Sequence, residues 1–177
     1  MGAPHEKTEM IREAVSEDAE VLAQIYNHYV AETVITFEEE PVTREEMWSR
    51  VSAVQERGLP WLVLELGNEL VGYAYAAPWK QRSAYRFSVE SSVYLSPKSV
   101  GGGFGKELYQ ALFAKLREGD THAVIAGIAL PNAASVALHE RFGFRPSGVF
   151  RQVGYKFERW VDVGYWELVL DSCELPA

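Results

Sequence analysis

The sequence predicts an α/β protein: a single domain in which helices pack on a mixed β-sheet. At 177 residues the chain can bury about 70% of its unfolded surface, which is enough for one full hydrophobic core. Its 47% hydrophobic and 24% charged residues are typical of globular domains. The periodic segments follow the order helix, helix, hairpin, strand, helix, strand, helix, hairpin, and neither a repeat nor a linker interrupts them.

Two helices are expected first. The earlier one follows Ser16, a favourable N-cap, and its apolar residues recur at helical spacing. The later one begins at the capping-box pattern of residues 43–46 and ends at Gly58. Phe37 and the acidic run 38–40 lie in the loop between them. This loop is interpreted either as a solvated segment or as a cover over a site.

Strands and helices then alternate along the chain. The expected elements are a hairpin (61–66 and 70–77), a strand (87–95), a helix closing near Gly119, a strand (121–130), a helix opened by Asn132 and an aromatic-rich final hairpin. Because side chains alternate between the two faces of a strand, Val89 and Ser91 should share one face of strand 87–95, and Glu90 should lie on the other.

Charge and cysteine content narrow the functional classes. The net charge of −8 disfavours nonspecific binding to nucleic acid or to an anionic membrane. The single cysteine, Cys173, excludes an intrachain disulfide framework and a cysteine-based metal cluster. With neither a targeting sequence nor a membrane-spanning run in view, we expect a cytoplasmic protein without a metal. The expected organisation is an N-terminal tail (1–9), one domain (10–172) and a C-terminal tail (173–177).

A glycine-rich loop is the most informative segment. Residues 101–105 contain four glycines between a strand and an amphipathic helix, where free amides and the helix dipole favour a phosphate or pyrophosphate. A Walker A loop would need glycine at Val100 and Ser or Thr at Glu107. The dinucleotide fingerprint would need glycine at Lys106. Both nucleotide patterns fail, and a flexible turn before a helix is the remaining alternative.

The strand, the loop ending Gly103-Phe104-Gly105 and the segment 130–144 together resemble the acetyl-CoA core of the GNAT superfamily of N-acetyltransferases. Val100 replaces the Arg or Gln with which the superfamily's loop usually starts. A narrower resemblance, to the phosphinothricin acetyltransferase family, spans residues 11–170. It is carried by Asn27-His28-Tyr29, Thr33-Val34 with Phe37, Ala77-Pro78-Trp79-Lys80, the segments 89–94, 130–132 and 138–140, and Gly154-Tyr155-Lys156 through Asp162-Val163-Gly164.

This resemblance implies a GNAT-like fold, a twisted mixed sheet flanked by about four helices. It also implies a homodimer that transfers an acetyl group directly from acetyl-CoA to the α-amino group of a glutamate-like amino acid. The implied acceptors are phosphinothricin, methionine sulfoximine, methionine sulfone and arsinothricin. The expected cofactor-binding residues are Val93, Tyr94, Leu95, Gly101, Gly102, Gly103, Phe104, Gly105, Lys106, Asn132 and Ser135.

Acetyl transfer needs a neutral amine, an oriented thioester and a stabilised thiolate. An α-amino group is mostly protonated at neutral pH, so a base must remove its proton. Glu90 stands where the family carries its catalytic glutamate, and burial in a partly apolar strand should raise its pKa. His139 replaces the tyrosine that most GNAT proteins carry in this segment. It could protonate the thiolate, act as a base through water, or be a packed helix histidine.

The acceptor's acidic groups need cationic or hydrogen-bonding partners. The predicted set is Phe37, Lys80, Gln81, Arg82, Tyr85 and Ser91. Arg82 is the first candidate for binding an acidic group, because a guanidinium can bind a carboxylate or phosphinate through two parallel hydrogen bonds. Lys80 is the second candidate. A solvated basic loop is the alternative. Two other functions stay open: acetylation of another amine, such as a protein N-terminus or a polyamine, and a non-catalytic acyl-CoA-binding sensor.

Overall fold

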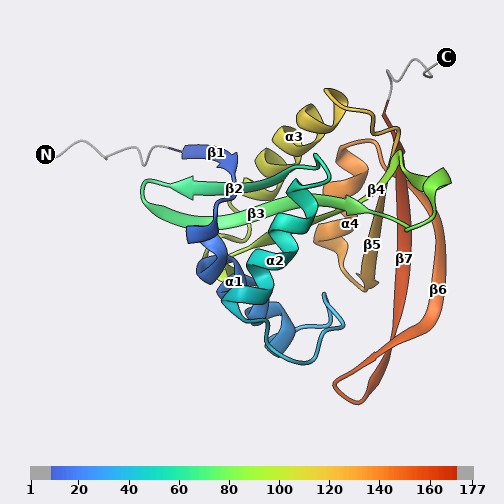
Figure 1. Ribbon diagram of the computed structural model, residues 1–177. Helices are drawn as coiled ribbons and strands as arrows, with labels where there is room; N and C mark the ends of the chain where they lie inside the picture. Colours follow the sequence, from blue (N-terminus) through green and yellow to red (C-terminus); the bar gives the residue numbers. More distant parts are fainter. Residues whose placement is uncertain (1–8, 171–177) are drawn as a thin grey trace, which may run out of the picture.

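The computed structural model describes residues 9–170 of the chain (Figure 1). Its helices are α1 (Ala19–Glu32), α2 (Arg44–Gln55), α3 (Phe104–Arg117) and α4 (Ala133–Arg141). Its strands are β1 (Glu9–Glu13), β2 (Trp61–Leu66), β3 (Glu69–Pro78), β4 (Ser88–Leu95), β5 (Ala123–Leu130), β6 (Arg145–Lys156) and β7 (Arg159–Val169). The strands form a seven-stranded sheet in the order β1-β2-β3-β4-β5-β7-β6. The predicted mixed sheet with four helices is therefore confirmed.

Two hydrophobic clusters lie on opposite faces of the sheet. Helices α1 and α2 cover one face, and α3 and α4 cover the other (Figure 1). Alternate residues of β2 supply both clusters: Trp61 and Val63 face α1 and α2, whereas Leu62 and Leu64 face α3. None of the helices in residues 9–170 is both long and apolar enough to cross a membrane.

The sheet opens between β4 and β5. These parallel strands pair over three positions, from Ser88 with Ala123 to Glu90 with Ile125. Beyond them β4 stays paired with β3 as far as Leu95, while β5 stays paired with β7. The inner edges of both strands are thus left without a strand partner. Backbone hydrogen-bonding groups at this gap are available to a ligand.

The N-terminal part differs from the prediction in two places. Glu9, expected in the tail, begins β1 and pairs with Leu66. Ser16 does not cap α1, because its hydroxyl donates to Glu17 and the carboxylate of Asp18 accepts the Val15 N–H instead. The sequence analysis did not predict β1. Only two adjacent residues of this five-residue strand are half buried, so the strand shows almost no alternation of apolar and polar residues. The expected tail 173–177 lies outside the described residues.

Arg12 links β1 to Asp18, just before α1, and to Glu65 of β2. Its guanidinium donates to both carboxylate oxygens of Asp18, at 2.7 and 2.8 Å, and also pairs with Glu65. Burial alone would raise the pKa of Asp18, but the hydrogen bonds from Arg12 and Val15 outweigh it and hold the pKa below its usual value. The stabilisation is therefore present above the unfolded-state pKa and is lost as the pH falls through the folded-state pKa.

We expect Asp18→Asn to lower the free energy of unfolding by about 2 kcal/mol at neutral pH, because Arg12 loses a charge-assisted partner. Urea unfolding at pH 7 and at about pH 3 measures this, and the difference between variant and parent should shrink at the lower pH. Glu17→Gln, one residue away and exposed, is the matched control. An equal loss at both pH values would contradict the assignment.

Candidate active site

Glu90 lies at the point where the sheet opens. It is the last β4 residue paired with β5, and its half-buried side chain is on the sheet face that α1 and α2 cover. Opposite it, a Cβ atom on Gly127 would lie 3.2 Å from the Glu90 carboxylate oxygen, so glycine leaves room for the carboxylate there. Burial raises the pKa of Glu90, and the positive charge of Lys80 partly opposes the rise. A carboxylate with a raised pKa is a competent general base.

A cavity of about 560 Å³ adjoins Glu90 on the same face. It is lined by Trp79, Lys80, Ile125, Ser147, Gly148, Val149, Phe150, Tyr165, Trp166 and Glu167. Tyr165 lies between the cavity and Glu90, because a Cβ atom built on Gly127 would be 3.2 Å from the Glu90 carboxylate and 3.3 Å from the Tyr165 ring. Burial and the charge of Glu90 together raise the pKa of Tyr165. The sequence assigned this residue only to an aromatic-rich hairpin, since an aromatic strand residue gives no sign of which cavity it lines.

The predicted basic loop joins β3 to β4. Lys80, Gln81, Arg82 and Tyr85 are all exposed there, and the Lys80 ammonium lies 4.9 Å from the centre of the Trp79 ring. Within residues 9–170, neither Lys80 nor Arg82 has a carboxylate within 4.0 Å. Lys80, which lines the cavity, and Arg82, which is exposed in the same loop, are therefore both free to meet an anionic ligand.

The α1–α2 loop contacts strand β6. Phe37 lies half exposed at its turn, and its ring packs against Gly154 of β6. Of the acidic run, Glu38 is ion-paired with Arg50 through contacts of 2.7 and 3.0 Å, whereas residues 39–40 are exposed. The two interpretations of this loop thus apply to different residues: it is solvated at 39–40 and held in place at 36–38.

Ser91 does not join these residues. As the alternation along β4 predicts, its side chain lies on the opposite face from Glu90, where it is buried. Its hydroxyl oxygen has no hydrogen-bond partner in the described chain. The structure therefore separates the Ser91 side chain from that of Glu90, because consecutive strand residues present their side chains to opposite faces, and a role of Ser91 in acceptor binding stays a prediction.

His139 is buried in the layer formed by α3 and α4, with 3% of its surface exposed. Its Nδ1 is 2.7 Å from the carbonyl oxygen of Ser135, so this nitrogen carries the proton and donates. Its Nε2 is 3.0 Å from the hydroxyl of Tyr109 and accepts from it. Burial lowers the pKa of His139 although the Ser135 bond opposes this. The geometry favours the packed-histidine alternative, and Tyr109 is the partner that sequence reasoning missed.

The glycine loop has the geometry of an anion site. Gly101 and Gly103 adopt left-handed backbone conformations, with φ of 88° and 89°, which only glycine enters without strain. Gly103 is the N-cap of α3 and has no side chain to satisfy the first amides of the helix. Lys106 lies exposed in the first turn. Gly102, Phe104 and Gly105 complete the segment. Gly105 is buried, and a Cβ atom built on it would lie 3.5 Å from Leu138 of α4.

Residues 93–95 line the gap with their backbone. Val93 and Leu95 pack toward α3 and α4, whereas Tyr94 packs against Tyr26 and Tyr29 on the other face. The Leu95 carbonyl oxygen accepts a hydrogen bond of 2.6 Å from the Tyr29 hydroxyl. These side chains therefore anchor β4 on both faces, which leaves its backbone edge as the ligand-facing surface.

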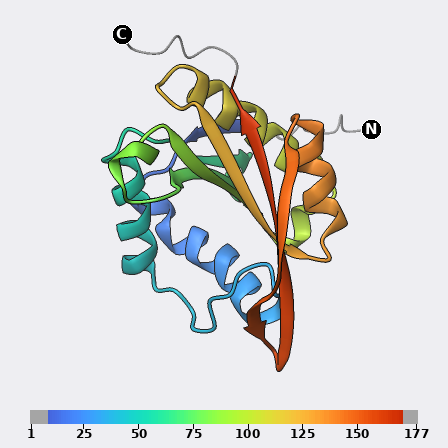
Figure 2. The same cartoon turned by 90° about the vertical axis from the view of Figure 1, so that its right-hand side faces the viewer.

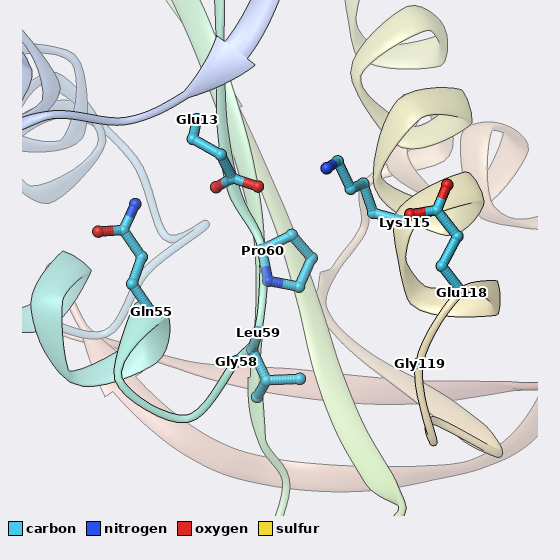
Figure 3. A pocket seen from close by; sticks show the side chains of 8 residues that line it. All are labelled: Glu13, Gln55, Gly58, Leu59, Pro60, Lys115, Glu118 and Gly119. Atoms are coloured by element: carbon cyan, nitrogen blue, oxygen red, sulfur yellow. The ribbon is translucent and has the colours of Figure 1, made fainter.

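Asn132 opens α4, and its side-chain oxygen accepts the Ser135 N–H at 3.1 Å, so the predicted cap is confirmed. Both residues are half buried near the end of β5. A separate cavity of about 480 Å³ lies between the ends of α2 and α3, where Glu13 and Lys115 reach in from opposite sides (Figure 3). It contains none of the predicted site residues.

The His139 geometry makes a spectroscopic prediction. Because burial and the Tyr109 and Ser135 contacts favour the neutral ring, His139 should keep its Nδ1–H tautomer at pH values where a free imidazole, with pKa about 6.5, is already half protonated. A ¹⁵N NMR titration of the ring nitrogens measures this, with the urea-unfolded protein as control. Protonation of the ring at the same pH in the folded and unfolded proteins would contradict the assignment.

Comparisons with known proteins agree with this geometry. The acetyltransferase (GNAT) domain family matches residues 11–164. The phosphinothricin N-acetyltransferase of Streptomyces coelicolor is 44% identical over 160 residues, which cover 89% of this chain and 94% of that protein. The L-methionine sulfoximine/L-methionine sulfone acetyltransferase of Salmonella typhimurium is 36% identical over 166 residues, covering 94% and 97%.

Solved structures show the same fold. A Salmonella typhimurium acetyltransferase with its cofactor acetyl-CoA superposes with a TM-score of 0.91 at 35% identity, covering 96% of this chain and 98% of that one. A ribosomal-protein-alanine N-acetyltransferase from Brucella melitensis gives 0.89 at 38%, covering 91% and 99%. The chain therefore belongs to the acetyltransferase (GNAT) family, among the phosphinothricin and methionine sulfoximine N-acetyltransferases, and is an acetyl-CoA-dependent N-acetyltransferase.

Proposed function

We propose that this enzyme acetylates the α-amino group of a glutamate-like amino acid analogue: phosphinothricin, methionine sulfoximine, methionine sulfone or arsinothricin. Such an acceptor combines an amine with two acidic or strongly polar groups. One observation carries the proposal: a half-buried carboxylate with a raised pKa, Glu90, pairs with Ile125 at the edge of the cavity that the unpaired cation Lys80 also lines. Arg82, a second unpaired cation, lies in the same exposed loop as Lys80. Acetylation of the amine would abolish its charge and detoxify the analogue.

Glu90 is the general base in this proposal. It removes the proton from the acceptor's ammonium group, because only the neutral amine carries the lone pair needed for attack. Its desolvated position at the mouth of the gap supplies the basicity. Gly127 leaves space beside the carboxylate for the amine. Transfer would then be direct, without an acyl-enzyme.

The basic loop binds the acidic groups. Arg82 can donate two parallel hydrogen bonds to a carboxylate or phosphinate, and Lys80 can add a point charge beside Trp79. Gln81 and Tyr85 offer further hydrogen bonds at the same edge. Phe37 of the α1–α2 loop would close the pocket from the other side.

The chain fits acetyl-CoA at the gap and the glycine loop. The left-handed glycines and the open amides of α3 suit a pyrophosphate, with Lys106 in the first turn of the helix. The free backbone edge of residues 93–95, together with Asn132 and Ser135 at the far side of the gap, suits the pantetheine arm. Acetyl-CoA supplies the acetyl thioester. In this arrangement His139 stabilises the α3–α4 packing around the gap rather than exchanging protons.

We also propose a homodimer in the cytoplasm. The hairpin β6–β7 exposes a set of large hydrophobic residues, which are Val149, Phe150, Val153, Tyr155, Phe157 and Trp160. Contiguous exposed hydrophobic side chains of this kind mark an interaction surface. The net charge of −8 disfavours nucleic acid and anionic membranes as alternative partners.

A second acceptor class has one observation in its favour. The Brucella melitensis neighbour is named a ribosomal-protein-alanine N-acetyltransferase, and it is 38% identical to this chain. A protein N-terminus would present the same α-amino group to Glu90, but without an acidic side chain for Arg82. The two classes therefore differ in their dependence on the basic loop.

Replacement of the base should abolish most turnover. We expect Glu90→Gln to lower kcat by at least about a hundredfold, the usual contribution of general base catalysis, with little change in acetyl-CoA binding. In the parent enzyme, kcat/KM should fall as the pH drops through the raised pKa of Glu90. A thiol-release assay with acetyl-CoA over a pH series measures both effects. Glu20→Gln on exposed α1 is the control, and full activity in Glu90→Gln would refute the assignment.

The basic loop should decide which acceptor is used. We expect Arg82→Ala to reduce kcat/KM for phosphinothricin by about 10- to 100-fold, the loss of a charge-assisted pair, and to leave spermidine unaffected. The panel for the thiol-release assay is phosphinothricin, methionine sulfoximine, arsinothricin, glutamate, an alanine-terminated peptide and spermidine. Arg44→Ala, an exposed arginine of α2, is the control. Preferred turnover of the peptide or spermidine by the parent enzyme would favour the second class.

A further inference from the structure

Lys156 is the most unusual charged residue of the described chain. It is the last residue of β6, directly before the two-residue turn that leads into β7, and only 2% of its surface is exposed. Full burial of a lysine is rare unless the ammonium group is paired. Its Nζ atom donates a hydrogen bond of 2.9 Å to the carbonyl oxygen of Thr36. Burial lowers the pKa of Lys156, although Glu39 and Glu38 oppose the change.

Thr36 belongs to the α1–α2 loop, 120 residues away in the sequence. Figure 2 shows this loop beside the far end of hairpin β6–β7. The contact continues at the next inward-facing residue of β6, because a Cβ atom built on Gly154 would overlap the ring of Phe37. One strand thus holds the loop through a hydrogen bond to its backbone and through a close contact with its aromatic side chain.

The other attachments of the loop come from its own helices. Tyr26 of α1 hydrogen-bonds Thr36 at 2.7 Å and Glu38 at 3.0 Å, and Arg50 of α2 binds Glu38 with two nitrogens. Lys156 therefore supplies an attachment that comes from β6 rather than from α1 or α2. Tyr26, which hydrogen-bonds the loop, packs edge-on against Tyr94 with ring centres 5.2 Å apart. Tyr94 and Glu90 lie on the same face of β4, so the loop and Glu90 are on the same side of the sheet.

We propose that Lys156 is a positioning residue of the acceptor site, where its buried ammonium holds the Thr36 carbonyl and so fixes Phe37 against Gly154 as a wall of the pocket. This inference rests on the proposed function, because the position of Phe37 matters only to an acceptor that binds beside Glu90. The glycine loop lies on α3 and makes no contact with this fastening, so acetyl-CoA binding should not depend on it.

The test replaces Lys156 with methionine, which keeps an unbranched chain of similar length and removes the donor. Hydrogen–deuterium exchange of residues 33–42 should become faster in Lys156→Met, while exchange of residues 103–117 stays unchanged. In the thiol-release assay the KM for the acceptor should rise by about tenfold, as for loss of one hydrogen bond of ordinary strength, with kcat and the KM for acetyl-CoA unchanged. Lys115→Met, an exposed lysine of α3, is the matched control.

A second route does not depend on burying a methionine. Gly154→Ala should displace the Phe37 ring and also accelerate exchange in residues 33–42, and adding Phe37→Leu should suppress that effect because the overlapping ring is gone. Unchanged loop exchange in both Lys156→Met and Gly154→Ala would overturn the proposal, as would a global loss of protection. Faster loop exchange in a protein that acetylates no member of the acceptor panel would support the fastening and refute the proposed function.

Discussion

The early separation of β4 from β5 is the constraint on which the rest of the structure depends. Two parallel strands that paired along their full length would satisfy each other's backbone and leave no space between them. Here the pairing stops at Glu90 and Ile125, so the strands diverge with free inner edges. Because the strands diverge, the N-terminal ends of α3 and α4 lie beside the gap between β4 and β5. Glu90 lies where this gap begins. A cofactor arm, an amine and a base can meet there without a dedicated loop.

The gap is stable because β4 is held on both faces. Val93 and Leu95 pack into the cluster under α3, and Tyr94 packs among Tyr26, Tyr29 and Tyr73 under α1. The Tyr29 hydroxyl also donates to the Leu95 carbonyl oxygen. Side chains therefore replace the missing strand pairing in keeping β4 extended. This packing leaves residues 93–95, which were predicted to bind the cofactor, with a backbone edge that has no strand partner on the β5 side.

The sequence predicted most of the framework and several local features of the candidate site. The Thr43 cap, the Asn132 cap and the glycine loop were located correctly, because capping residues and glycines are recognised from neighbouring residues in the sequence. The surroundings of His139 and Lys156 could not be predicted in this way. Their partners, Tyr109 and Thr36, lie 30 and 120 residues away, and a pattern of local spacing carries no information on such contacts. The alternation along β4 correctly placed Ser91 on the face opposite Glu90, and its role in acceptor binding stays a prediction.

Glu90 and Lys156 have few partners for their charges. Burial and the charge of Lys80 alone shift the pKa of Glu90, with no hydrogen bond contributing. Lys156 has one hydrogen-bond acceptor for an ammonium that can donate three bonds, together with the Phe157 ring 5.0 Å away and the charges of Glu38 and Glu39. Elsewhere in the described chain, Asp18 and Glu38 receive bidentate arginine partners. A protein selected for stability alone would pair or expose Glu90 and Lys156 as well. The cost of burying these two charges is explained if Glu90 exchanges a proton and Lys156 holds Phe37 in place. Such unfavourable burial is expected where function, rather than folding, determines the residue.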